Sequence, residues 1–385
     1  MPPHLRSAGT SALRAVAGAV LGLSAVATAA TAQITNAPTG TKDPLMLRAD
    51  SPGGTYTASD PSLRFFYGAT MDGVNLDGVA RVETPIADMP GYSEFCTGTR
   101  ISARAVLTAA HCVTDQYTGA LTSTRATPTT VRFVGPGAGG VGSAFYSFTT
   151  STVFVQSTWQ GFYNSKTSLS QDVAVLLFDA PLPSFVTTYG LFDNGPLGSQ
   201  TATGLNTVNA GYGTYGSGTG ATGFDGRRRA GDNVIDFVAN DPTSNDYGDL
   251  YTSFEDSNNS YNSVCGLAAL GQFPSFACHA SRGLTEAGTA PGDSGGPLFI
   301  NGMLAGVTSF GTYFCDPAVT TTCSPYMSGD PTRASNAYGS LNGFAPVSAN
   351  AAFITNAVNA PEPTTIALTG FGVLAVAAAS RRRQS

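Results

Sequence analysis

The chain has few charged residues and no excess of basic ones. Charged side chains account for 11% of its 385 residues, and 19 Lys and Arg stand against 25 Asp and Glu, which gives a formal net charge of −6. This negative net charge gives no basic footprint and argues against nucleic acid as a partner. With 42% hydrophobic residues, the chain also lacks the composition of a disordered protein. Its 46 glycines instead suit a folded all-β domain rich in turns.

The N-terminal segment has the features of a secretory signal peptide. Arg6 and Arg14 precede an apolar stretch from Ala15 to Ala30, and Ala30-Thr31-Ala32 supplies an A-x-A-like cleavage site. The pattern predicts a signal peptide over residues 1–32. Export to an oxidising compartment would make disulfides reasonable for the six cysteines.

The C-terminal apolar run is slightly short for a membrane span. Thr364–Ala379 is 16 residues long and uncharged, whereas a transmembrane helix needs about 17–25. Together with Pro361-Glu362-Pro363 before it and Arg381-Arg382-Arg383 after it, the segment 359–385 resembles the PEP-CTERM sorting signal of Gram-negative bacteria. The resemblance implies secretion machinery and an exosortase as partners, export across the inner membrane, and a cell-surface or extracellular location. A plain single-span tail anchor is the alternative, and in both cases the membrane is met only through the terminal signals.

Histidine is scarce, and one of the three histidines suits catalysis. His111 ends the apolar run that begins at Val106. His4 lies in the targeting segment, and His279 follows Cys278 without a supporting motif. His111 is therefore the candidate general base.

A hydroxyl nucleophile stands among tight-turn glycines in Gly292-Asp293-Ser294-Gly295-Gly296-Pro297. Because a serine hydroxyl is almost fully protonated at neutral pH, it needs a base, an orienter for that base, and N–H donors for the developing oxyanion. Asp172, which opens the buried-looking strand Val173–Phe178, lies between His111 and Ser294 along the chain. The order His111, Asp172, Ser294 is one of the known orders of a Ser-His-Asp triad.

At these motifs the chain resembles the chymotrypsin/trypsin-like serine proteases. The resemblance implies an all-β fold of two six-stranded antiparallel β-barrels with a short C-terminal helix, for which Ala351–Val358 has suitable residues. Short β-branched or aromatic runs such as Thr130–Val134 and Leu298–Thr308, separated by turn residues, also favour a barrel or a sandwich. We expect a protease domain over residues 71–358 and a leader or propeptide over residues 33–70.

The same resemblance implies an enzymatic activity, and two alternative functions stay open beside it. It predicts a secreted or surface-sorted serine endopeptidase, monomeric, which takes a protein or peptide substrate and needs no cofactor or metal. A catalytically silent binding or adhesion module on the same fold, and an esterase with the same triad, stay open. The acidic stretch 241–262, with Asp246, Asp249, Glu255 and Asp256, is interpreted as a solvated loop, with a calcium site as the alternative.

The resemblance also assigns residues around the nucleophile. The backbone N–H groups of Gly292 and Ser294 would form the oxyanion hole. Gly288 would form the base of the primary specificity pocket with Thr289 beside it, and Ser309-Phe310-Gly311 would pair with the extended substrate.

The predicted pocket floor has no carboxylate. A Lys or Arg side chain would be buried without a partner above Gly288, which is costly. We therefore expect small or apolar residues before the cleaved bond, and a preference for Lys or Arg would instead point to Glu286 or another acid. The opposite wall is expected near Asn336–Tyr338.

Six cysteines allow 15 pairings, so the sequence alone leaves their connectivity open. The resemblance implies disulfides between Cys96 and Cys112 and between Cys265 and Cys278, with Cys315 paired to Cys323. The chain departs from the family at Ala290, four residues before the nucleophile, where a cysteine is usual.

Three further stretches have plain interpretations. Gly218–Gly223 formally matches G-x-G-x-x-G, but Gly, Ser and Thr surround it in place of a strand and a helix, which indicates a flexible surface loop. Arg227–Arg229 is interpreted as a solvated strand end. About 26 residues before Cys96, the segment Thr70–Val74 lacks the Ile-Val-Gly-Gly-like start that the family's activation uses, so the activation site stays open.

Overall fold

The computed structural model describes thirteen stretches of the chain. They are residues 45–48, 66–86, 89, 91–122, 128–137, 143–163, 169–192, 202–218, 220–238, 248–255, 262–269, 274–312 and 338–360. The predicted signal peptide, most of the leader, the sorting tail from residue 361 onward, and both Cys315 and Cys323 lie outside these stretches. Among the described residues, no helix is both long and apolar enough to cross a membrane.

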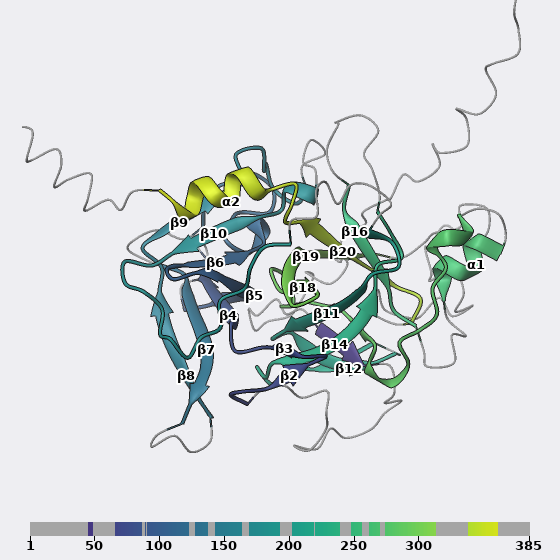
Figure 1. Ribbon diagram of the computed structural model, residues 1–385. Helices are drawn as coiled ribbons and strands as arrows, with labels where there is room; N and C mark the ends of the chain where they lie inside the picture. The colour runs from purple at the N-terminus through teal and green to yellow at the C-terminus, as the bar shows by residue number, and fades with distance from the viewer. Residues whose placement is uncertain are drawn as a thin grey trace, which may run out of the picture.

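The first barrel is a single antiparallel sheet closed by a bent strand (Figure 1). Its strand order is β8-β7-β4-β5-β6-β10-β9. Strands β8 and β9 are adjacent in sequence but stand at opposite ends of that order. The Thr150 N–H bonds to the Thr129 carbonyl near β7, and the Ser151 N–H bonds to the Leu177 carbonyl in β10. The two segments are therefore one strand bent at Thr150-Ser151, and six strands close the barrel. The bounds are β4 (Val79–Pro85), β5 (Ser93–Ser102), β6 (Ala105–Thr108), β7 (Thr130–Pro136), β8 (Ser143–Thr149), β9 (Thr152–Val155) and β10 (Ala174–Leu177).

The second barrel closes in the same way. Its order is β14-β11-β18-β19-β20-β16-β15, and β14 and β15 are separated only by Ile235 and Asp236. The Ile235 N–H bonds to the Leu205 carbonyl next to β11, and the Asp236 N–H bonds to the Tyr251 carbonyl in β16. The prediction of two six-stranded antiparallel barrels is confirmed. The bounds are β11 (Asn206–Gly211), β14 (Arg229–Val234), β15 (Phe237–Val238), β16 (Leu250–Ser253), β18 (Pro297–Ile300), β19 (Met303–Thr312) and β20 (Leu341–Pro346).

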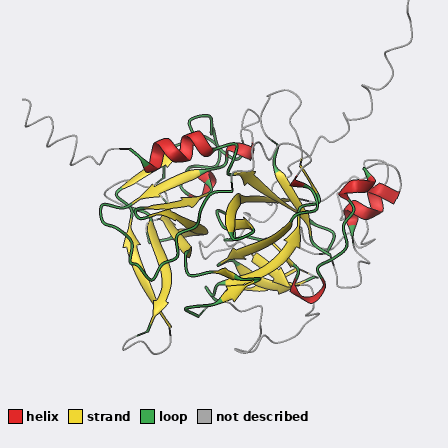
Figure 2. Cartoon of the chain, viewed as in Figure 1, coloured by secondary structure: helices red, strands yellow, loops and turns green. Residues whose placement is uncertain are grey.

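Smaller elements complete the described part of the fold (Figure 2). A four-stranded sheet orders β13 (Gly220–Gly223), β12 (Thr214–Ser217), β1 (Leu45–Arg48) and β17 (Ala287–Gly288). Strand β1 comes from the predicted leader, and its Leu47 pairs with Gly288. Strands β2 (Thr70–Met71) and β3 (Val74–Asn75) form a hairpin, and α1 (Ser263–Ala269) lies in the second half of the chain.

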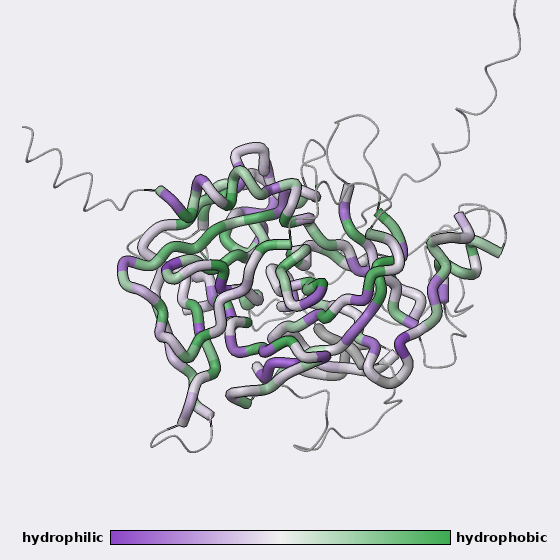
Figure 3. Tube along the Cα trace, viewed as in Figure 1, coloured by the Kyte–Doolittle hydropathy of each residue, from purple (hydrophilic) through white to green (hydrophobic). Residues whose placement is uncertain are grey.

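The terminal helix α2 (Ala351–Val358) has the bounds that its sequence predicted. Ile354 and Ala357 are buried with the core residues of the first barrel, so the helix covers that barrel's end (Figure 1). Apolar segments run through the strands of both barrels (Figure 3). Burial of this apolar surface, at about 25 cal/mol per Å², is the main stabilising contribution.

Two predictions about local structure were wrong. The run Leu298–Thr308 is a hairpin, because Asn301 and Gly302 have φ values of 50° and 75° and turn the chain between β18 and β19. Gly218–Gly223 is not simply a surface loop, since β13 pairs with β12 there. The dinucleotide motif stays rejected, because a second strand follows β12 where that motif needs a helix.

The arginine run is also more buried than predicted. Arg228 is 0% exposed and donates hydrogen bonds to the Leu76 and Phe66 carbonyls, and its guanidinium lies 3.5 Å from Asp77. Arg229 is 4% exposed and pairs with Asp225 at 2.8 Å. Arg227 is exposed, as predicted for a solvated strand end. The acceptors of Arg228 come from distant parts of the chain, whereas Asp225 is only four residues before Arg229.

Candidate active site

Antiparallel pairing of β6 and β10 brings His111 and Asp172 together. Thr108 at the end of β6 lies opposite Ala174 at the start of β10, so the residues just beyond them meet at one end of the barrel. The His111 Nδ1 lies 2.6 Å from the Asp172 Oδ2, and the His111 backbone N–H donates to the Asp172 Oδ1 at 2.9 Å. Asp172 is 0% exposed. A fully buried carboxylate thus holds both the ring and the main chain of the histidine.

Two other side chains contact this pair. The Ser309 hydroxyl donates to the Asp172 Oδ2 at 2.6 Å. The Phe162 ring meets the His111 ring edge-on, with 5.5 Å between centroids. The Ser309-Phe310-Gly311 motif predicted that the backbone of Ser309 would pair with the substrate. It did not predict the bond between the Ser309 side chain and Asp172. No local pattern pointed to Phe162.

The Ser294 segment packs against the histidine segment of the first barrel. The Ser294 carbonyl accepts the Thr97 N–H at 2.8 Å and lies 3.6 Å from the Cys112 Sγ. Gly295 has φ of 81°, and a Cβ there would lie 2.1 Å from the Thr108 Oγ1 and 2.3 Å from the Thr97 carbonyl oxygen. Only glycine allows this approach. Ser294 itself, the predicted nucleophile, remains partly exposed.

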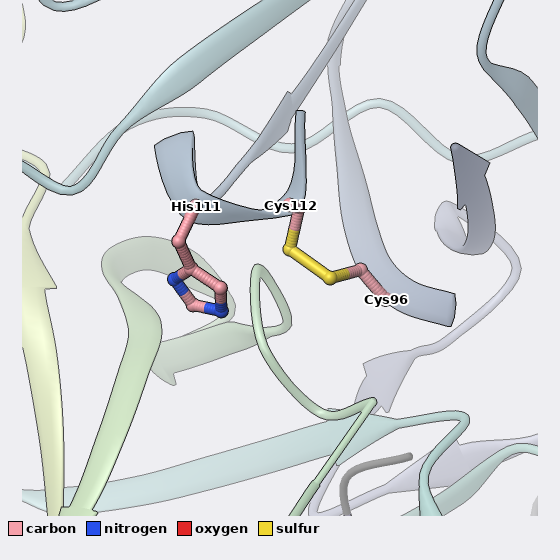
Figure 4. A group of neighbouring side chains, drawn as sticks. All are labelled: Cys96, His111 and Cys112. Atoms are coloured by element: carbon pink, nitrogen blue, oxygen red, sulfur yellow. A yellow bond between two sulfur atoms is a disulfide. The ribbon is translucent and has the colours of Figure 1, made fainter. Parts of the chain in front are cut away.

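A disulfide joins Cys96 of β5 to Cys112, directly after His111 (Figure 4). It fastens the histidine segment to a neighbouring strand of the same barrel. The two sulfurs and the imidazole lie close enough to resemble a metal site, but sulfurs joined to each other are not the thiolates that bind metals. A second disulfide joins Cys265 and Cys278. Both are pairings that the family resemblance implies, and the third falls on undescribed residues.

The sequence model of the Trypsin family matches residues 82–328. The chain belongs to the trypsin family. Among solved structures, it is similar to human heparin binding protein, with 19% identity over 75% of this chain and 94% of that chain at a TM-score of 0.43. It is also similar to neuropsin, a serine protease expressed in the limbic system of mouse brain, with 17% identity over 74% of this chain and 95% of that chain at a TM-score of 0.42. No curated protein matches it.

The expected specificity pocket of this trypsin-family domain is uncharged at its floor. Gly288 is buried in β17, and a Cβ there would lie 2.8 Å from the Phe254 ring. The Thr289 N–H and hydroxyl both bond to the Asn342 Oδ1, at 2.7 and 3.0 Å. Tyr338, the described residue of the expected opposite wall, packs its ring 5.0 Å from that of Phe254. Phe254 and Asn342 were missed because only the pairing of β16, β19 and β20 brings them here.

Ser309-Phe310-Gly311, the segment expected to pair with substrate, lies on β19. Ser309 is 3% exposed, while Phe310 and Gly311 are half-buried. Phe310 pairs with Gly343 of β20, and a bulge next to it shifts the register between Thr308 and Phe310.

Glu286, the acid considered for this pocket, is fully buried and already bonded. Its carboxylate accepts hydrogen bonds from the Glu255 N–H at 2.5 Å, the Ser281 hydroxyl at 2.7 Å and the Arg282 N–H at 2.6 Å. Glu255 is 3% exposed and accepts a bond from the Ser253 hydroxyl. Burial raises the pKa of Glu255 well above its ordinary value, and the neighbouring Glu286 raises it further. Glu255 therefore lies in the protein interior rather than in a solvated loop.

This buried acid should make stability depend on pH. The carboxyl of Glu255 ionises in the unfolded chain near pH 4.5, but in the folded protein it stays protonated to a higher pH. The free energy of unfolding therefore falls as the pH rises above 4.5. Glu255→Gln cannot ionise, and we expect its Tm at pH 8 to exceed that of wild type by about 2–4 °C. Thermal unfolding at pH 5 and pH 8 measures this, with the half-buried Glu94→Gln as the control. Equal pH dependence in wild type and Glu255→Gln would contradict it.

Asp293, which precedes Ser294, is completely buried. It accepts N–H groups from Gly213 at 3.1 Å and Ala290 at 3.3 Å, and burial raises the pKa of its carboxyl well above the ordinary value. A Cβ on Gly211 would lie 1.9 Å from the Asp293 Oδ1, so a larger residue there would displace the carboxyl. Within the described residues, Asp293 takes part in no salt bridge.

Proposed function

We propose that this chain is a serine endopeptidase that hydrolyses peptide bonds through Ser294, His111 and Asp172. The observation that carries the proposal is the 2.6 Å contact between the His111 Nδ1 and the buried Asp172. A partly exposed Ser294 accompanies it, and the Ser294 carbonyl lies 3.6 Å from the Sγ of Cys112, the residue after His111. A carboxylate at Nδ1 keeps the proton on that nitrogen and leaves Nε2 free to accept one. Family membership makes acyl transfer the expected chemistry.

The proposed reaction proceeds through an acyl-enzyme. The Ser294 Oγ attacks the scissile carbonyl carbon while the His111 Nε2 takes its proton, and the carbonyl electron pair moves to oxygen. The C–N bond then breaks, the leaving amine takes the proton from His111, and Ser294 holds the acyl group as an ester. Water then attacks the ester carbon while His111 takes its proton. The bond between the acyl carbon and the Ser294 Oγ breaks, and His111 returns the proton to this oxygen, which releases the acid and regenerates the hydroxyl. Asp172 stabilises the imidazolium in both halves.

The proposed oxyanion donors are the N–H groups of Gly292 and Ser294. Gly292 has φ of 92°, a conformation that glycine adopts readily. It is the third residue of a turn in which the Asp293 N–H bonds to the Ala290 carbonyl at 3.2 Å. Pro291 in the second position and a glycine with positive φ in the third are features of a type II turn.

The described disulfides support the proposed export. Two cystines, Cys96–Cys112 and Cys265–Cys278, are typical of proteins that mature in an oxidising compartment. We propose that residues 1–32 direct export and that the tail 359–385 sorts the protein to the surface of a Gram-negative cell. N-terminal sequencing and intact mass of the secreted protein would test both ends, and a secreted form with both ends uncut would refute the processing.

Labelling and a substrate profile test the proposed activity. A fluorophosphonate probe should label wild type at Ser294, and a peptide library should show cleavage after small or apolar residues because the floor at Gly288 is uncharged. A lack of labelling would favour a binding module, and labelling with cleavage of esters but not peptides would favour an esterase. A profile dominated by Lys or Arg would refute the predicted pocket.

A further inference from the structure

We propose that Thr97 is a positioning residue for the oxyanion hole, through hydrogen bonds to both residues that would donate to the oxyanion. This inference rests on the proposed function, since it concerns the same site. Thr97 lies on β5 of the first barrel and is 0% exposed. Within the described part of the chain, none of its hydrogen bonds goes to His111 or to a predicted pocket residue, so an effect on the reaction would pass through the segment that holds Ser294.

Both the side chain and the main chain of Thr97 bond to that segment. The Thr97 Oγ1 donates to the Gly292 carbonyl at 2.5 Å, and the Thr97 N–H donates to the Ser294 carbonyl at 2.8 Å. One residue of the first barrel therefore anchors both proposed oxyanion donors of the second.

The hydroxyl bond matters most at Gly292. Glycine has no Cβ to limit its backbone, so a hydrogen bond to its carbonyl is one of the few restraints on its conformation. The N–H that would meet the oxyanion belongs to the same residue as this carbonyl. A donor must be held in place before the reaction for its stabilisation of the oxyanion to be large.

Thr97 also connects this segment to the wall of the second barrel. Its Oγ1 accepts the Tyr212 N–H at 3.0 Å, so the one hydroxyl both donates and accepts. Its carbonyl accepts the Thr108 hydroxyl at 2.7 Å. If the hydroxyl rotated away from the Gly292 carbonyl, its hydrogen bond from the Tyr212 N–H would also be distorted. The two bonds together therefore fix the orientation of the hydroxyl.

The neighbouring Thr99 provides a matched control. It lies two residues along β5, on the same face, and is 1% exposed. Within the described part of the chain, its buried hydroxyl has no hydrogen-bond partner. Thr99→Val removes the same atom as Thr97→Val from a similar environment, but it leaves no carbonyl or N–H without a partner.

The test compares Thr97→Val, Thr97→Ser and Thr99→Val in the full chain. For Thr97→Val we expect kcat to fall by about 10–100-fold with KM within about twofold, because the lost restraint acts on the oxyanion rather than on ground-state binding. Binding of a peptide boronate, whose tetrahedral adduct places an oxygen in the oxyanion hole, should weaken in parallel. Thr97→Ser keeps the hydroxyl and should recover most of the activity, and Thr99→Val should behave as wild type.

A second measurement does not depend on activity. Hydrogen exchange of the peptide covering residues 290–296 should be faster in Thr97→Val than in wild type and Thr99→Val. Equal loss of kcat in the two valine variants, or unchanged exchange and unchanged kcat in Thr97→Val, would overturn the inference. If wild type does not label with the fluorophosphonate, the proposed function fails, and unchanged exchange would then show separately that Thr97 does not restrain the segment.

Discussion

Ser294→Ala is expected to reduce peptide hydrolysis by about 10⁴–10⁶-fold, because no hydroxyl remains to form the acyl-enzyme. The change removes one oxygen from a partly exposed side chain. The contacts that hold the segment come from the Ser294 carbonyl and from Gly295, which the substitution retains. The free energy of unfolding should therefore change by no more than about 0.5 kcal/mol.

The measurement is kcat/KM on a peptide from the library profile, together with urea unfolding. Ser157→Ala, which removes the hydroxyl of an exposed serine, is the control and should retain wild-type activity. Turnover by Ser294→Ala within tenfold of wild type would remove Ser294 as the nucleophile. A Ser294→Ala variant that is folded but inactive would show that the missing hydroxyl, and not unfolding, causes the loss of activity.

Asp172→Asn should lower kcat by about 10⁴-fold. The carboxylate accepts three hydrogen bonds, from the His111 ring, the His111 backbone and the Ser309 hydroxyl. An amide of the same shape replaces one acceptor oxygen with an NH₂ donor. That donor would leave the proton of His111 on Nε2, and the imidazole could not act as a base toward Ser294.

The stability of Asp172→Asn and the activity of a second variant show whether kcat falls because the histidine is no longer oriented or because the protein unfolds. Ser309→Ala removes one of the three donors without changing the charge, and its kcat should fall far less than that of Asp172→Asn. Fluorophosphonate labelling rates would follow the same order. An Asp172→Asn variant that keeps a tenth or more of wild-type kcat while folded would show that another group orients His111.

The local features of this chain could be predicted because each depends on a few neighbouring residues. Ala351–Val358 forms a helix with the predicted bounds. The Asn301-Gly302 pair contained the signal for a hairpin, but Leu298–Thr308 was treated as one uninterrupted run. The family prediction held because the motifs around His111, Asp172 and Ser294 are specific in order as well as in composition.

The contacts that surround the site could not be predicted, since they join residues far apart in sequence. Thr97 reaches Gly292 across the junction of the barrels, and Arg228 reaches carbonyls near residues 66 and 76. Glu255 looks like a loop acid in the sequence, yet it is buried against Glu286. In each case the partner is set by strand register and barrel closure, which no local pattern specifies.

By itself, the sequence determined the family, the strand-rich class and the residues with reactive groups, because these follow from residue chemistry and short-range pattern. Only the tertiary structure decided which groups meet: the His111–Asp172 contact, the packing of Gly288 against Phe254, and the bonds from Thr97 to the Gly292–Ser294 segment. Reactivity depends on distances of about 3 Å between such groups. Those distances arise when two closed barrels bring distant strands side by side.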